Sequence, residues 1–139
     1  MSTRKVISAP GAPPAVGPYS HAVRAGELLF CSGQIPLDPQ TGELVGADAS
    51  EQARQCLQNL EAVCEAAGAQ LSRAVRLTVY VTDLGQFAAV NEVYGSFFFA
   101  SGDPGGGGPP AGEPPARVTV QVAALPLGAQ VEIDAVVAL

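Results

Sequence analysis

The polar side chains that could do chemistry in this sequence are few, and the most conspicuous of them is Arg117. It is the only cation from residue 77 to the end, and it opens a valine-rich stretch directly after Pro115-Ala116. A guanidinium among apolar residues needs an anionic partner, because an unpaired buried charge is very costly. That partner is either Glu132 or Asp134 in an internal ion pair, or a ligand carboxylate, which arginine binds bidentately. Strand alternation slightly favours the internal pair and leaves both interpretations open.

Four other candidates each have a structural explanation beside a functional one. Glu132 and Asp134 share one strand face, where they form a solvated edge or orient a water molecule. Tyr19 follows the rigid Gly17-Pro18 pair and either recognises a ligand or anchors a turn. Asn91 lies one residue from an apolar helix stripe, as a surface amide does.

The single histidine, His21, is expected to have a structural or surface role. With one histidine in the chain, a multi-histidine metal site is excluded. The three cysteines have no metal-ligand spacing, and we expect them to be reduced and buried in a cytoplasmic protein. No metal ligands are therefore assigned.

Two helices are predicted to support these residues. Residues 49–67 carry apolar side chains at spacings of three and four, with Asp48 and Glu51 at capping-box spacing and Gly68 at the C-terminal end. A second helix is predicted from Leu84 to Phe98, with Asp83 as its N-cap.

Strand patterns occur in five places. Residues 76–81, 117–122 and 131–137 alternate with a period of two, which predicts strands with one face under helices and one face more polar. Residues 21–24 and 28–32 predict a hairpin, residues 38–42 a turn, and residues 9–18 an irregular segment. Helices gathered on one face of a mixed or antiparallel sheet make an α+β domain.

Composition narrows the class of partner. Seven basic residues against 13 acidic ones give a net charge of −6, and no basic patch is present, which argues against nucleic acid and anionic membrane surfaces. No apolar run is long enough to span a membrane, and the N-terminus does not resemble a secretory signal. Of the 16 Gly and 12 Pro, 11 lie in residues 102–115, which are 14 residues long. We therefore expect a single domain, residues 1–139, with a mobile loop at 102–115.

The same residues occur in five stretches that resemble the RidA/YjgF family of imine and enamine deaminases. These stretches are Gly17-Pro18-Tyr19-Ser20, Ser32-Gly33-Gln34-Ile35-Pro36, Val90-Asn91-Glu92-Val93-Tyr94, Pro115-Ala116-Arg117 and Val131-Glu132-Ile133-Asp134-Ala135. The resemblance implies a chorismate-mutase-like α+β fold, with a mixed, mostly antiparallel sheet, two helices on one face and a trimeric barrel. It also implies a homotrimer with clefts between subunits and no cofactor.

The resemblance further implies hydrolysis of 2-imino acids, such as 2-iminopropanoate and 2-iminobutanoate, to 2-oxo acids and ammonia. This activity protects pyridoxal-phosphate enzymes. Arg117 matches the arginine that holds the substrate carboxylate, and Glu132 matches the glutamate that positions the attacking water. Tyr19, Asn91 and the Ser32-Gly33 backbone match other cleft-lining positions.

Two departures from the family pattern stand beside Arg117. The connection before it is longer than usual and rich in Gly and Pro, and Pro114 occupies a position that is commonly aromatic. Asp134 also replaces a more usual glutamate. Two alternative functions remain: an endoribonuclease or translation inhibitor, which the acidic charge disfavours, and a non-catalytic trimer that binds small carboxylates.

Overall fold

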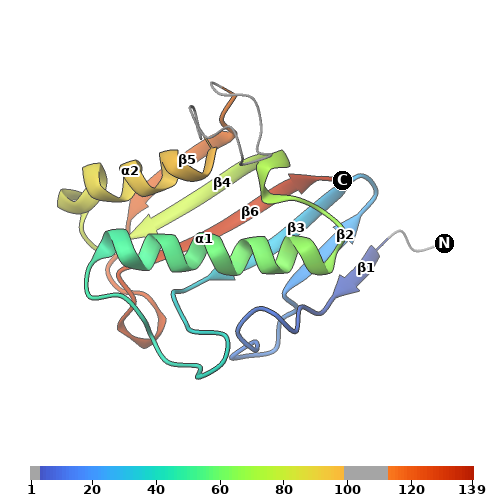
Figure 1. Cartoon of the computed structure of the whole chain (residues 1–139), viewed down its shortest axis with the longest axis horizontal. Coiled ribbons are helices and arrows are strands. Elements are labelled where there is room, and N and C mark those ends of the chain that lie inside the picture. Colours follow the sequence, from blue (N-terminus) through green and yellow to red (C-terminus); the bar gives the residue numbers. More distant parts are fainter. Residues whose placement is uncertain (1–3, 99–112) are drawn as a thin grey trace.

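In the computed structural model, which describes residues 4–98 and 113–139, two α-helices cover one face of a six-stranded sheet (Figure 1). The sheet order is β1-β2-β3-β6-β4-β5. The strands are β1 (Arg4–Ile7), β2 (Ala22–Ala25), β3 (Leu28–Gln34), β4 (Ala74–Val81), β5 (Ala116–Gln121) and β6 (Val131–Ala138). The α-helices are α1 (Ala49–Ala66) and α2 (Phe87–Phe98), with 3-10 turns at Leu71–Arg73, Leu84–Gln86 and Pro126–Gly128. The predicted α+β class is confirmed.

Neighbouring strands are antiparallel except for β4 and β5, which are parallel. The β2–β3 hairpin lies where the sequence predicts it and turns at Gly26, whose φ of +59° favours glycine. Parallel strands need a crossover connection, and α2 lies on the connection between β4 and β5. The helix that follows β4 therefore lies over the edge of the sheet where β5 begins.

Helix α1 begins and ends close to the predicted residues. The Asp48 carboxylate accepts the backbone N–H of Glu51 at 2.9 Å, and the Glu51 carboxylate accepts the N–H of Ala47 at 3.0 Å. Gly68 follows the helix with a φ of +72°. The predicted second helix is divided, since Leu84–Gln86 forms a 3-10 turn capped by Asp83 and α2 begins at Phe87.

The core fills the space between the helices and the sheet. It is built from the inward side chains of β3, β4 and β6 and the apolar stripe of α1, including Leu29, Leu57, Leu60, Leu77, Val79, Ile133 and Val137. The opposite face of the sheet is uncovered in a single chain. Phe30, Val118 and Val120 on that face are 46%, 44% and 37% exposed. Apolar patches of this kind mark interaction surfaces.

Strand β5 differs from the other strands in which residues face the helices. Its register pairs Arg117 with Leu77 and Thr119 with Val79, so the polar pair lies on the helix face. The valines of β5 consequently point to the open face. Alternation predicted the strand correctly, but polarity alone did not indicate which face is covered.

Residues 9–18 contain no helix or strand, as predicted, and His21 holds part of this segment. The His21 Nδ1 accepts the N–H of Ala9 at 2.9 Å, and its Nε2 donates to the carbonyl of Pro13 at 2.7 Å. The structural role expected for His21 is confirmed. The sequence did not predict β1, which precedes this segment and pairs with β2.

The three cysteines, Cys31, Cys56 and Cys64, are free and buried, as predicted. A hydrogen bond with Cys64 and burial raise the pKa of the Cys31 thiol far above its ordinary value. The loop expected at 102–115 lies outside the described residues except for residues 113–115. The single domain spanning 1–139 remains a prediction.

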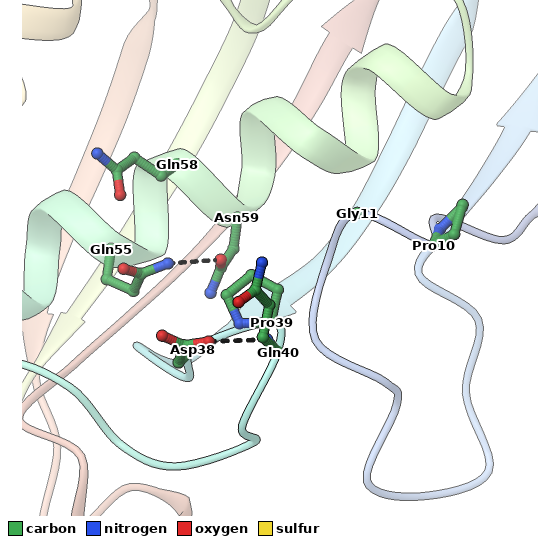
Figure 2. A pocket seen from close by; sticks show the side chains of 8 residues that line it. All are labelled: Pro10, Gly11, Asp38, Pro39, Gln40, Gln55, Gln58 and Asn59. Atoms are coloured by element: carbon green, nitrogen blue, oxygen red, sulfur yellow. Dashed lines mark hydrogen bonds between the residues drawn. The ribbon is translucent and has the colours of Figure 1, made fainter.

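Asn59 joins α1 to the loop that follows β3. It is 1% exposed, and its Nδ2 donates to the carbonyls of Ile35 at 3.3 Å and Leu37 at 3.0 Å. Its Oδ1 accepts Nε2 of Gln55 at 2.9 Å. A polar pocket of about 520 Å³ lies beside this amide, between α1, residues 38–40 and Pro10-Gly11 (Figure 2). No predicted site residue lines it.

We expect Asn59→Ala to lower the free energy of unfolding by about 2 kcal/mol, because it removes the side-chain donor to the Leu37 carbonyl and leaves the Ile35 carbonyl with the N–H of Leu37 alone. Urea unfolding followed by circular dichroism measures this loss. Gln58→Ala, at the adjacent exposed position, is the matched control and should change the stability by less than about 0.5 kcal/mol. Equal stability of the two variants would contradict the role given to Asn59.

Candidate functional site

The guanidinium of Arg117 lies against one face of α2. Its Nη1 donates to Oδ1 of Asn91 at 2.7 Å, and its Cζ lies 4.7 Å from the ring centroid of Tyr94 and 5.5 Å from that of Phe87. Phe87, Asn91 and Tyr94 are spaced by four and three residues, which brings them to the same helix face. The negative π-faces of the rings attract the cation. Helix α2 therefore fixes the position of Arg117.

Arg117 has no carboxylate partner among residues 4–98 and 113–139. The bond to Asn91 uses one of five guanidinium N–H donors, which leaves donors for an anion. The internal ion pair is excluded within one chain by the strand register. Glu132 is opposite Tyr80 and Asp134 is opposite Thr78, whereas Arg117 is opposite Leu77. Both carboxylates therefore lie on the other face of the sheet.

Two buried hydroxyls accompany Arg117. Oη of Tyr94 and Oγ1 of Thr119 have no hydrogen-bond partner among the described residues. Burial raises the pKa of Tyr94 to about 12, although the charge of Arg117 acts in the opposite direction. Tyr94 therefore stays a neutral donor at physiological pH. Tyr94, Phe87 and Thr119 were not predicted as neighbours of Arg117. Two spacings in the sequence could have indicated them. Residues 87, 91 and 94 lie on one face of a helix, and residues 117 and 119 lie on one face of a strand.

Glu132 lies on the open face, against the backbone of β3. The β3–β6 pairing shifts register between Cys31 and Gln34, as a β-bulge does. A Cβ at Gly33 would collide with Oε2 of Glu132 and lie 2.9 Å from its Cδ. Glycine is therefore required for this close approach. Burial, and then the negative charge of Asp134, raise the pKa of Glu132 above its ordinary value.

Ser32, which precedes Gly33 on β3, is bonded to the two residues that follow Tyr19. The Ser32 hydroxyl donates to the carbonyl of Ser20 at 2.7 Å, and the Ser32 N–H donates to the carbonyl of His21 at 3.0 Å. These bonds attach Ser20 and His21, which follow Tyr19, to β3. Tyr19 is 44% exposed, and its Oη accepts the N–H of Val16 at 3.2 Å. Tyr19 thus anchors its turn and still presents an exposed ring.

The predicted site residues form two groups in one chain. Arg117 and Asn91 lie on the helix face at the β5 edge, while Glu132, Gly33 and Ser32 lie on the open face at the β3–β6 junction. One sheet separates the two groups. A molecule of a few carbon atoms cannot reach both groups of the same chain.

Two classes of site are absent from the described parts of the chain. Residues 4–98 and 113–139 contain no group of three His, Cys, Asp or Glu side chains that could hold a metal ion. Among the same residues, no helix has the length and apolar character needed to cross a membrane.

Comparison with known proteins assigns this arrangement to a family. The family model described as Endoribonuclease L-PSP matches residues 9–139. The chain is 52% identical over 133 residues to the RutC family protein y4sK of Sinorhizobium fredii, with 96% of both chains covered. It is 41% identical over 133 residues to the 2-iminobutanoate/2-iminopropanoate deaminase of Homo sapiens, covering 96% of this chain and 88% of that one.

Solved structures have the same fold. Escherichia coli TdcF with bound serine has a TM-score of 0.85 at 42% identity, with 97% of this chain and 98% of that chain covered. The E. coli YjgF gene product has a TM-score of 0.84 at 42% identity, covering 96% and 98%. The match over nearly the whole chain, together with the arginine and glutamate in their expected strands, shows that this chain belongs to the RidA/YjgF family, whose model is described as Endoribonuclease L-PSP.

Proposed function

We propose that this chain hydrolyses small 2-imino acids, such as 2-iminopropanoate and 2-iminobutanoate, to 2-oxo acids and ammonia. The observation that carries this proposal is Arg117, held by Asn91 and two rings with donors free for a carboxylate. A small 2-imino acid offers one planar carboxylate for a bidentate contact. The name of the human relative, a 2-iminobutanoate/2-iminopropanoate deaminase, supports the same substrate class.

Two side chains, Arg117 and Glu132, are sufficient for the proposed hydrolysis. Arg117 holds the carboxylate and thereby fixes the adjacent imine carbon. Glu132 accepts a proton as water attacks the carbon of the protonated imine, and a carbinolamine forms. Glu132 then passes this proton to the nitrogen and the C–N bond breaks to release ammonia. The hydroxyl returns its own proton to Glu132 as its oxygen becomes the carbonyl of the 2-oxo acid. An imine is already electrophilic, so this sequence requires no metal or organic cofactor. Removal of such imines in the cytoplasm would protect pyridoxal-phosphate enzymes.

We also propose that three copies form a homotrimer with clefts between subunits. The exposed Phe30, Val118 and Val120 give the open sheet face an apolar surface suited to a second copy. An arginine and a glutamate on opposite faces of one sheet can meet when the glutamate belongs to a neighbouring copy. Each cleft then combines Arg117 of one subunit with Glu132 of the next.

Arg117→Lys should lower kcat/KM for 2-iminopropanoate by about 100-fold, because lysine keeps the charge and loses the planar fork. The imine is generated with a dehydratase, and 2-oxopropanoate release is followed at early times. Arg54→Lys, on the exposed side of α1, is the matched control and should stay within about twofold of wild type. Tight 2-oxo acid binding without turnover by wild type would favour the non-catalytic carboxylate binder.

Mixed oligomers test whether each cleft uses two chains. Arg117→Ala and Glu132→Gln are each inactive in this proposal, but refolding them together restores clefts that hold both wild-type side chains. A random 1:1 mixture should regain about one quarter of the wild-type clefts. Activity is measured before and after co-refolding, with each variant refolded alone as its control. No recovery would place both residues in one cleft of the same chain.

Gly33→Ala should lower kcat/KM by at least about tenfold, because the new Cβ displaces the Glu132 carboxylate from its position over β3. The control is Gly11→Ala, where a Cβ would make an ordinary 3.7 Å contact with Ala62. Circular dichroism and size-exclusion chromatography verify that both variants keep their fold and assembly. Unchanged kinetics in Gly33→Ala would show that the close approach is dispensable.

A further inference from the structure

Asp134 and Tyr80 surround Glu132 on the open face of the sheet. Asp134 lies two residues along β6 on the same face, so the Cα atoms of the two acids are about 7 Å apart along the strand. Tyr80 of β4 is the cross-strand partner of Glu132, and its hydroxyl donates to Oδ2 of Asp134 at 3.2 Å. The tyrosine therefore links the strand position opposite Glu132 to the carboxylate of Asp134.

We propose that Asp134, held in place by Tyr80, is a positioning residue that strengthens Glu132 as the proton acceptor of the cleft. The kinetic part of this inference rests on the proposed function. A fixed negative charge disfavours a second negative charge nearby, so Glu132 binds its proton more tightly. A stronger base takes a proton from water more readily, but it is ionised over a narrower pH range.

Within one copy, the surroundings of Glu132 contain few other charges; in the proposed homotrimer, Arg117 of a neighbouring copy adds a positive charge to the same cleft in wild type and variants alike. On the open face, β3 contributes Ser32 and Gly33, and β5 contributes valines, none of which titrates. Strand β4 contributes Tyr80 beside Glu132, and Arg76 farther along, opposite Val136. Behind the sheet, α1 contributes the buried Cys56, whose thiol donates to the carbonyl of Val131.

The effects on proton affinity agree with this geometry. Burial is the largest cause that raises the pKa of Glu132, and the charge of Asp134 is the second. Burial, then the charge of Asp134, also raise the pKa of Tyr80, so the tyrosine keeps its proton and remains a donor. Within the described residues, Asp134 is thus the carboxylate that acts on Glu132 at short range.

Direct titration of Glu132 tests the inference whether or not the protein is a deaminase. The full-length protein is labelled with 13C at glutamate Cδ, and the Glu132 resonance is assigned by its loss in Glu132→Gln. Asp134→Asn should move the Glu132 midpoint to lower pH, and Tyr80→Phe should move it in the same direction by less. The Glu61 resonance on α1 is the internal reference. Glu27→Gln, which removes a charge at the β2–β3 turn, should leave the midpoint unchanged.

The kinetic test has a specific signature. Removing a unit charge about 7 Å away changes proton affinity about threefold at the dielectric constant of water, which is the lower limit for this partly buried group. On the acidic limb, Asp134→Asn should keep about three times more of its own plateau activity than wild type. Its plateau kcat should fall by up to about threefold, because Glu132 is a weaker base. A merely structural role would lower activity at every pH without shifting the limb.

The outcomes separate the two proposals. A Glu132 midpoint that does not move in Asp134→Asn overturns the role of Asp134, whatever the activity. A midpoint that moves, in a wild-type protein that hydrolyses no imine, keeps this role and overturns the proposed function. A shift of equal size in Glu27→Gln would attribute the effect to net charge and overturn the specific role of Asp134.

Discussion

The alternation of side chains between the two faces of a sheet is the constraint on which the candidate site depends. Arg117 and Glu132 lie on strands separated only by β4, yet the register sends them to opposite faces. This arrangement explains how an arginine and two carboxylates coexist without forming an internal ion pair. It also leaves each half of the site incomplete in one chain. In the proposed homotrimer, a neighbouring copy supplies the missing half.

Each half is prepared by contacts that involve no ligand. Arg117 is fixed by an amide and two rings of α2, which limits the freedom it would otherwise lose on binding an anion. Glu132 occupies the space left open at Gly33, opposite Tyr80 of β4. Both halves therefore use rigid elements, which hold catalytic geometry more accurately than loops do.

Much of the fold could be predicted from local patterns. The capping residues of α1, the hairpin at Gly26 and the alternating stretches depend on neighbours within a few positions, so the sequence shows them directly. Strand β1 was missed because its four residues pair across an irregular segment, and no local period marks such a pairing. The covered face of β5 was also hidden, since it depends on the position of α2 rather than on the hydrophobicity of the valines.

The candidate residues themselves were visible, but their grouping was not. Arg117, Asn91 and Glu132 were found by chemical type and by resemblance. Their separation into two groups follows from the registers of β5 and β6 on β4, which no alternation pattern contains. The spacing of Phe87, Asn91 and Tyr94 shows that they share one face of α2. The sequence does not show that this face meets Arg117, because α2 and β5 are separate elements whose packing no local pattern specifies.

The parallel pairing of β4 and β5 has a consequence for how this chain can change in evolution. In a hairpin, the length of the turn sets the register of the two strands. In a crossover, the ladder sets the register, and a longer connection adds only a slowly growing entropic cost. Insertions between α2 and β5 can therefore accumulate while Arg117 remains opposite Leu77. The segment that varies most easily in length is joined to the strand whose position must vary least.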